Sequence, residues 1–93
     1  MPRVLCEVTE GLRATERTVE IKTYSGTSVF LRVAKGMVRE TSGGKGQIEV
    51  GLIHQDEASK AVLIELPREA DTGEYRIWVK RETLVDESGR VRA

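Results

Sequence analysis

The sequence predicts an all-β fold, a small antiparallel β-barrel or bent sheet of about six strands. Apolar and polar residues alternate through most of the chain, which is the period of a half-buried strand. Glycine, serine, proline and aspartate gather between the alternating segments, where turns are expected. Since the chain has only 93 residues, we expect a single domain with one small core.

The alternating segments place the strands in chain order. They are centred on residues 4–8, 19–23, 29–33, 48–52, 62–66 and 75–79. Residues of one parity in these strands should face the core. The expected core consists of Val19, Ile21, Val29, Leu31, Val33, Ile48, Val50, Leu52, Val62, Ile64, Ile77 and Val79.

In the first hairpin, the alternation of apolar residues indicates the length of the turn. A three-residue loop over 24–26 pairs Ile21 with Val29 and keeps both on one face, whereas a two-residue loop would turn one of them toward water. The longer loop also puts Gly26 where a left-handed residue follows a type I turn. We therefore predict the three-residue loop.

The later connections are short. Residues 42–46 form the tip of a second hairpin, residues 56–60 form a turn, and Pro67 ends the fifth strand because it has no amide donor. A helix over 56–66, with an aspartate cap and an end before the proline, is the alternative, and it would change the fold to α+β. The single β domain covers 1–85, and the polar segment 86–93 is expected to be a flexible tail.

Composition limits the expected binding partners and the expected cellular location of the protein. Fifteen basic and fifteen acidic residues cancel, which disfavours a dedicated nucleic-acid binder. Cys6 is the only cysteine, so no internal disulfide can form, and no segment approaches the roughly 20 apolar residues of a membrane span. We expect a cytoplasmic protein that is not embedded in a membrane.

Several short motifs suggest chemistry that their context does not support. Residues 71–73 (Asp-Thr-Gly) match the catalytic triplet of aspartic proteases, but only twenty residues follow, so we interpret them as a turn. Gly44-Lys45-Gly46 lacks the other residues of a phosphate-binding loop. His54 is the only histidine and Cys6 alternates with valines, so neither a zinc site nor a nucleophile is predicted. We expect no catalytic residue, metal site or cofactor.

One outward strand face remains as a candidate site. If Tyr75, Ile77 and Val79 face the core, then Arg76, Trp78 and Lys80 lie on the opposite face. Phe30 and Arg32 occupy a similar outward position on the early hairpin, and Arg81 extends the basic surface. An exposed aromatic between cations suits an extended peptide or a stacked base. Coverage of a barrel end by Trp78 is the competing interpretation.

The closing segment bears a resemblance to a known fold family. Residues 75–80 would be a strand, 81–83 a short helical turn and 84–85 a brief last strand. This order is similar to the end of SH3-like small β-barrels, which makes that fold our best expectation. The resemblance implies no function by itself.

The sequence therefore predicts a non-enzymatic interaction module. It would bind a protein partner, or a second copy of itself, through the outward aromatic and basic face. The alternative is a weak nucleic-acid-binding β-barrel that uses Arg76, Trp78, Lys80 and Arg81.

Overall fold

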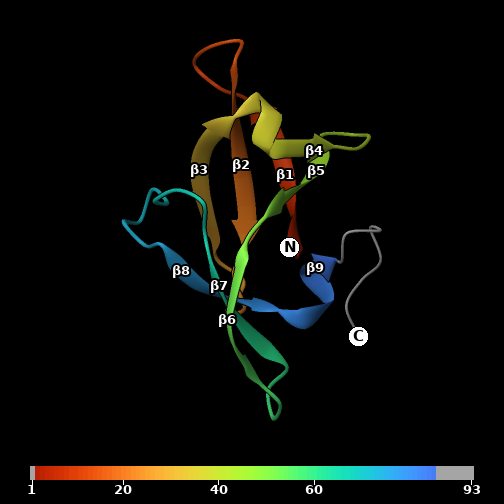
Figure 1. Ribbon diagram of the computed structural model, residues 1–93, viewed down its shortest axis with the longest axis vertical. Coiled ribbons are helices and arrows are strands. Elements are labelled where there is room, and N and C mark those ends of the chain that lie inside the picture. Colours follow the sequence, from red (N-terminus) through yellow and green to blue (C-terminus); the bar gives the residue numbers. More distant parts are fainter. Residues whose placement is uncertain (1, 86–93) are drawn as a thin grey trace.

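The computed structural model describes residues 2–85, which form nine strands and two short 3-10 helices and contain no α-helix (Figure 1). The elements in chain order are β1 (Arg3–Glu10), β2 (Glu16–Lys22), β3 (Ser28–Ala34), η1 (Lys35–Met37), β4 (Val38–Glu40), β5 (Lys45–Glu49), β6 (Gly51–Asp56), β7 (Ala61–Glu65), β8 (Arg76–Lys80), η2 (Arg81–Thr83) and β9 (Leu84–Val85). The predicted all-β class is confirmed.

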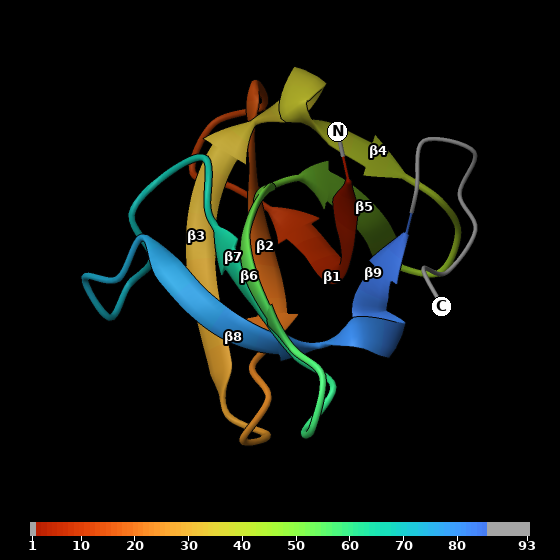
Figure 2. The ribbon, with the colours of Figure 1, turned by 60° about the horizontal axis from the view of Figure 1, so that its bottom comes forward.

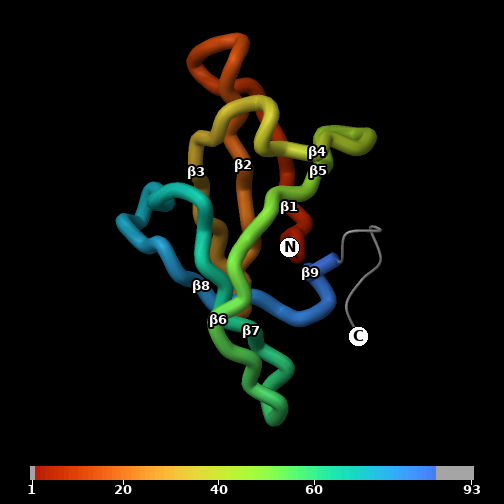
Figure 3. Tube along the Cα trace, in the orientation of Figure 1, coloured from red at the N-terminus to blue at the C-terminus, as the bar shows by residue number. Residues whose placement is uncertain are grey.

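The strands build two antiparallel sheets. The six-stranded sheet has the order β3-β2-β1-β5-β4, with β9 also paired to β1, and the three-stranded sheet has the order β6-β7-β8. The chain passes from the first sheet to the second at Val50, between β5 and β6. Figure 3 shows the tube running from β5 into β6. The result is a bent pair of sheets and not a closed barrel.

The core lies between the two sheets. Eleven of the twelve expected core residues are buried, and the twelfth, Leu52, is partly buried against them. The side chains of Val4, Cys6, Val8, Leu66, Ala70 and Leu84 complete this cluster. The alternation of small β-branched residues therefore encodes the inner faces of both sheets.

The register of the first hairpin is confirmed. Ile21 pairs with Val29 across β2 and β3, and both are buried. The loop is the three-residue one, since the Thr23 amide donates to the Thr27 carbonyl. Gly26 adopts φ +94°, which a residue with a side chain rarely does.

Three expectations need correction. The alternative helix over 56–66 is wrong, because that segment holds a turn and β7, whose β-branched residues pair with β6 and β8. Tyr75 is 54% exposed and does not share the core with Ile77, because it precedes the start of β8. The strand expected at 48–52 is divided at Val50, and β4 is an additional strand, whose three residues are too few to be signalled by periodicity.

The closing strand, short helical turn and final strand occur where expected, as β8, η2 and β9. The expected tail, 86–93, lies outside the described residues. Within residues 2–85, no helix has the length and apolar character needed to cross a membrane.

Candidate functional site

The outer face of β8 carries the aromatic that the sequence singles out. Along this strand Ile77 and Val79 are buried, whereas Arg76, Trp78 and Lys80 are exposed. Trp78 leaves 40% of its surface accessible. The predicted outward orientation of these three side chains is therefore confirmed.

Three side chains form a row across the three-stranded sheet, and Trp78 is one of them. His54 pairs with Leu63, and Leu63 pairs with Trp78. The His54 ring meets the Trp78 ring edge to face, with centroids 6.2 Å apart and planes at 88°. This geometry is favourable for aromatic pairs. The contact with His54 therefore helps to hold the Trp78 ring in its orientation.

Sequence reasoning did not connect His54 with Trp78, because a β-bulge sets the register of His54 in the sheet. The register shifts between Leu52 and His54, so one extra residue, Ile53, interrupts the alternation. Simple alternation would give His54 the same face as Leu52, which packs against the core. The bulge brings His54 to the outer face instead, and no local sequence signal marks it.

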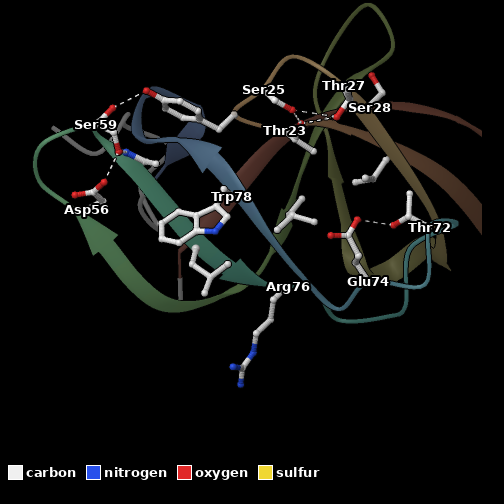
Figure 4. A pocket seen from close by; sticks show the side chains of 15 residues that line it. Thr23, Ser25, Thr27, Ser28, Asp56, Ser59, Thr72, Glu74, Arg76 and Trp78 are labelled. Atoms are coloured by element: carbon white, nitrogen blue, oxygen red, sulfur yellow. Dashed lines mark hydrogen bonds between the residues drawn. The ribbon is translucent and has the colours of Figure 1, made fainter.

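Beside Trp78 is a pocket of about 880 Å³, which we call the Trp78 pocket (Figure 4). Its lining residues come from the β2–β3 loop and β3, from the β6–β7 turn and β7, and from the β7–β8 loop and β8. The residues of its hydroxyl-bearing rim are Thr23, Tyr24, Ser25, Thr27, Ser28, Ser59 and Thr72. Its other lining residues are Val29, Asp56, Ala61, Leu63, Glu74, Arg76, Ile77 and Trp78.

Hydrogen bonds from Tyr24 close one end of this pocket. The Tyr24 amide donates to the Trp78 carbonyl at 2.8 Å, and its hydroxyl donates to the Ser59 carbonyl at 2.9 Å. The tips of the β2–β3 and β6–β7 hairpins consequently lie close together, at the bottom of Figure 2. The two sheets are thus fastened to each other at the pocket.

The other end is closed by the loop between β7 and β8. The Asp71 amide donates to the Phe30 carbonyl at 2.8 Å, and the Phe30 amide donates to Asp71 Oδ1 at 2.9 Å. Asp71 therefore bonds to β3. The turn itself is confirmed, since the Gly73 amide donates to the Ala70 carbonyl at 2.9 Å and Gly73 has φ +89°.

Between these two ends, β8 presents an unused backbone edge. The Leu66 amide donates to the Tyr75 carbonyl, so Tyr75 and Ile77 point their backbone groups toward β7. By alternation, Arg76 and Trp78 point theirs away from β7. Apart from the Trp78 carbonyl, these groups make no backbone hydrogen bond within residues 2–85.

The cations of the expected basic face are largely neutralised. Arg76 Nε lies 3.0 Å from Glu65 Oε2, and Arg81 lies 3.2 Å from Glu57 Oε1. Lys80 has no ion pair among the described residues. The surface around Trp78 therefore presents less positive charge than the sequence suggests.

The pocket itself contains two carboxylates. Hydrogen bonds from the Ser59 hydroxyl and the Ala58 amide hold the pKa of Asp56 below its usual value, so Asp56 stays ionised. Glu74 accepts a hydrogen bond from the Thr72 hydroxyl at 2.8 Å. Because Arg76, the one cation in the lining, is paired with Glu65, the pocket is acidic.

The six predicted site residues do not form one cluster. Arg76 and Trp78 line the Trp78 pocket, whereas Lys80 and Arg81 do not. Phe30, which is 41% exposed, and Arg32 border a second depression with residues 69–71. The Phe30–Asp71 hydrogen bonds lie between these two regions.

The remaining motifs have structural roles. Burial raises the pKa of the Cys6 thiol to about 12, so the thiolate is disfavoured. Lys45 forms an ion pair with Glu7, and this contact lowers the pKa of Glu7. Among residues 2–85, no three histidine, cysteine, aspartate or glutamate side chains are grouped to hold a metal ion.

Comparison with known proteins gives no relatives: no protein-family model, curated protein or solved structure matches the chain.

Proposed function

We propose that the protein is a non-enzymatic interaction module that holds a segment of a protein partner in the Trp78 pocket. The observation that carries this proposal is the position of Trp78. It is 40% exposed and borders a pocket of about 880 Å³ that one free strand edge also lines. Tryptophan is among the residues that contribute most to binding energy at protein interfaces.

The form of the pocket supports a partner segment. Its volume falls in the range of about 300–1,000 Å³ typical of ligand sites. Apolar surface from Val29, Leu63 and Ile77 lies beside hydroxyl groups at the rim. Such a mixture gives both buried contact area and polar groups that fix orientation.

The other expected partners receive less support. A second copy of the chain would need the full edge of β8, but Tyr24 already occupies the Trp78 carbonyl. For a nucleic acid, the arginines would first have to leave Glu65 and Glu57, and Glu74 would face the phosphates. The SH3-like relationship and the cytoplasmic location stay predictions.

Peptide display tests the proposal. A random library of displayed peptides is selected on the full chain, and binders are then compared on the Trp78→Ala and Met37→Ala variants. Met37 is the matched control, since it is 42% exposed, much like Trp78, and does not line the pocket.

We expect enriched peptides that bind the parent and Met37→Ala chains and lose at least about tenfold affinity for Trp78→Ala, as truncation of a binding hot spot does. A selection without enrichment, or with enriched peptides that bind all three chains equally, contradicts the proposal.

A further inference from the structure

We infer that the occupant of the Trp78 pocket is an extended peptide with a basic side chain, added as a strand along the free edge of β8. This inference rests on the function proposed above and specifies the conformation and charge of the partner. It follows from the backbone groups, the length and the charges of the pocket.

The free backbone groups set the mode of binding. The Arg76 amide and carbonyl and the Trp78 amide point away from β7 and have no backbone partner among the described residues. An antiparallel strand satisfies all three, because one peptide residue exchanges two bonds with Arg76 and the residue two positions earlier accepts from Trp78. Pairing of a peptide with an exposed edge is a general mode of recognition.

The two closed ends set the length. The free backbone groups lie between the Glu74 carbonyl, which accepts from the Ala70 amide, and the Trp78 carbonyl, which accepts from the Tyr24 amide. A bound strand can therefore extend from Glu74 to Trp78. Four residue steps in a strand span about 13 Å. A stretch of about five residues therefore fits, and a longer strand would collide with one of the closures.

Alternation assigns the side chains of the bound peptide. Residues opposite Tyr75 and Ile77 point inward, toward the floor that Val29 and Ile77 form. Residues opposite Glu74, Arg76 and Trp78 point outward. The inward positions therefore suit a small branched apolar side chain such as valine.

Charge selects the outward side chains. Glu74 lines the pocket and has no ion pair among the described residues, so a cation opposite it gains a direct partner. A cation opposite Trp78 can lie against the indole face. Arg76 already has Glu65 as its partner, so an uncharged residue suits the position opposite it.

These assignments define a probe. The blocked pentapeptide lysine-valine-threonine-valine-lysine puts lysines opposite Glu74 and Trp78 and threonine opposite Arg76. Two matched peptides isolate its features: in one both lysines are glutamates, and in the other the threonine nitrogen is methylated, which removes the donor to the Arg76 carbonyl. Each is titrated into the labelled full chain by NMR at low salt.

We expect the lysine pentapeptide to shift the amide signals of Arg76 and Trp78. The glutamate peptide should bind at least about tenfold more weakly, and the N-methyl peptide at least about fivefold more weakly. Glu74→Gln should weaken the lysine peptide several-fold, whereas Glu69→Gln, a nearby change outside the pocket, should leave its affinity unchanged.

The contrary results separate the inference from the function. Equal binding of the glutamate peptide overturns the basic partner, and an unaffected N-methyl peptide overturns strand addition. If the lysine peptide does not bind while display yields peptides that depend on Trp78, the inference fails and the proposed function stands. If display yields none, both fail.

Discussion

Strands β1 and β8 have the same alternation of buried and exposed side chains but use their backbone edges differently. In both strands every second residue is buried. β1 pairs with β2, β5 and β9, so both of its edges are occupied, whereas β8 pairs with β7 alone. The comparison shows that side-chain periodicity and edge availability are independent properties: the first builds the core and the second leaves a place for a partner.

The two faces of β8 provide the sharpest test of this division. Ile77→Ala should lower the free energy of unfolding by about 2–5 kcal/mol, because it opens a cavity in the core. Trp78→Ala should lower it by only about 1 kcal/mol, since 40% of Trp78 is exposed, yet it should remove peptide binding. Urea denaturation measures both. Equal losses of stability would mean that Trp78 is a structural residue.

Because both edges of β1 are paired, we expect the packing around β1 to tolerate added side-chain volume poorly. A Cβ atom at Gly46, on the neighbouring strand β5, would lie 2.7 Å from Val8 Cγ2 and 3.1 Å from the Arg39 carbonyl oxygen. Gly46→Ala should therefore cost about 1–3 kcal/mol through overpacking.

Gly36→Ala is the control for that substitution, because nothing lies within 4 Å of its Cβ position. Thermal unfolding compares the two variants. A Gly46→Ala chain as stable as the Gly36→Ala chain would show that β1 and β5 can separate slightly without loss.

A further difference concerns pH. Cys6 on β1 keeps its proton in the folded chain up to a pKa of about 12, against a value of 9.0 for the unperturbed thiol. Below pH 9 both states are protonated and the contribution of the thiol is complete. Between pH 9 and 12 the unfolded chain loses the proton first, so the free energy of unfolding should fall by up to about 1.4 kcal/mol per pH unit.

Urea titrations of the parent and Cys6→Ala chains at pH 8, 9 and 10 isolate this effect, because other titrating groups cancel in the difference. The parent should lose stability more steeply than the variant above pH 9. Parallel curves would show that the Cys6 thiol reaches water in the folded state.

The smallest effect is expected from the ion pair on the outer face of β8. The side chains of Arg76 and Glu65 are 56% and 47% exposed, so Glu65→Gln should change stability by less than about 1 kcal/mol. It also frees the cation beside the Trp78 pocket and should weaken the lysine pentapeptide. A large loss of stability would show that this pair helps to hold β8 in the sheet.

The sequence was informative about the fold wherever alternation was regular. Residues such as Ile21, Val29 and Ile77 were placed correctly because burial of one face dictates a period of two. Local signals failed where the chain departed from that period. The bulge at Ile53 sets the register that pairs His54 with Leu63, and the division of one strand at Val50 joins the two sheets.

For the candidate site, alternation predicted the orientation of Trp78 but not its surroundings. The partners of Arg76 and Arg81 come from other strands and turns, Glu65 and Glu57. The pocket depends on contacts between residues far apart in the chain, such as Tyr24 with Trp78. Such contacts follow from the topology, which periodicity does not specify.

Because the Tyr24 amide donates to the Trp78 carbonyl, hydrogen exchange of the Tyr24 amide proton should report on separation of the two sheets. This hydrogen bond joins the hairpin of the six-stranded sheet to the edge of the three-stranded sheet. That amide can exchange with solvent deuterium only when the two sheets move apart at this point or the chain unfolds. Its exchange rate, set against that of the buried Ile64 amide, would give the free energy needed to open the molecule at its junction.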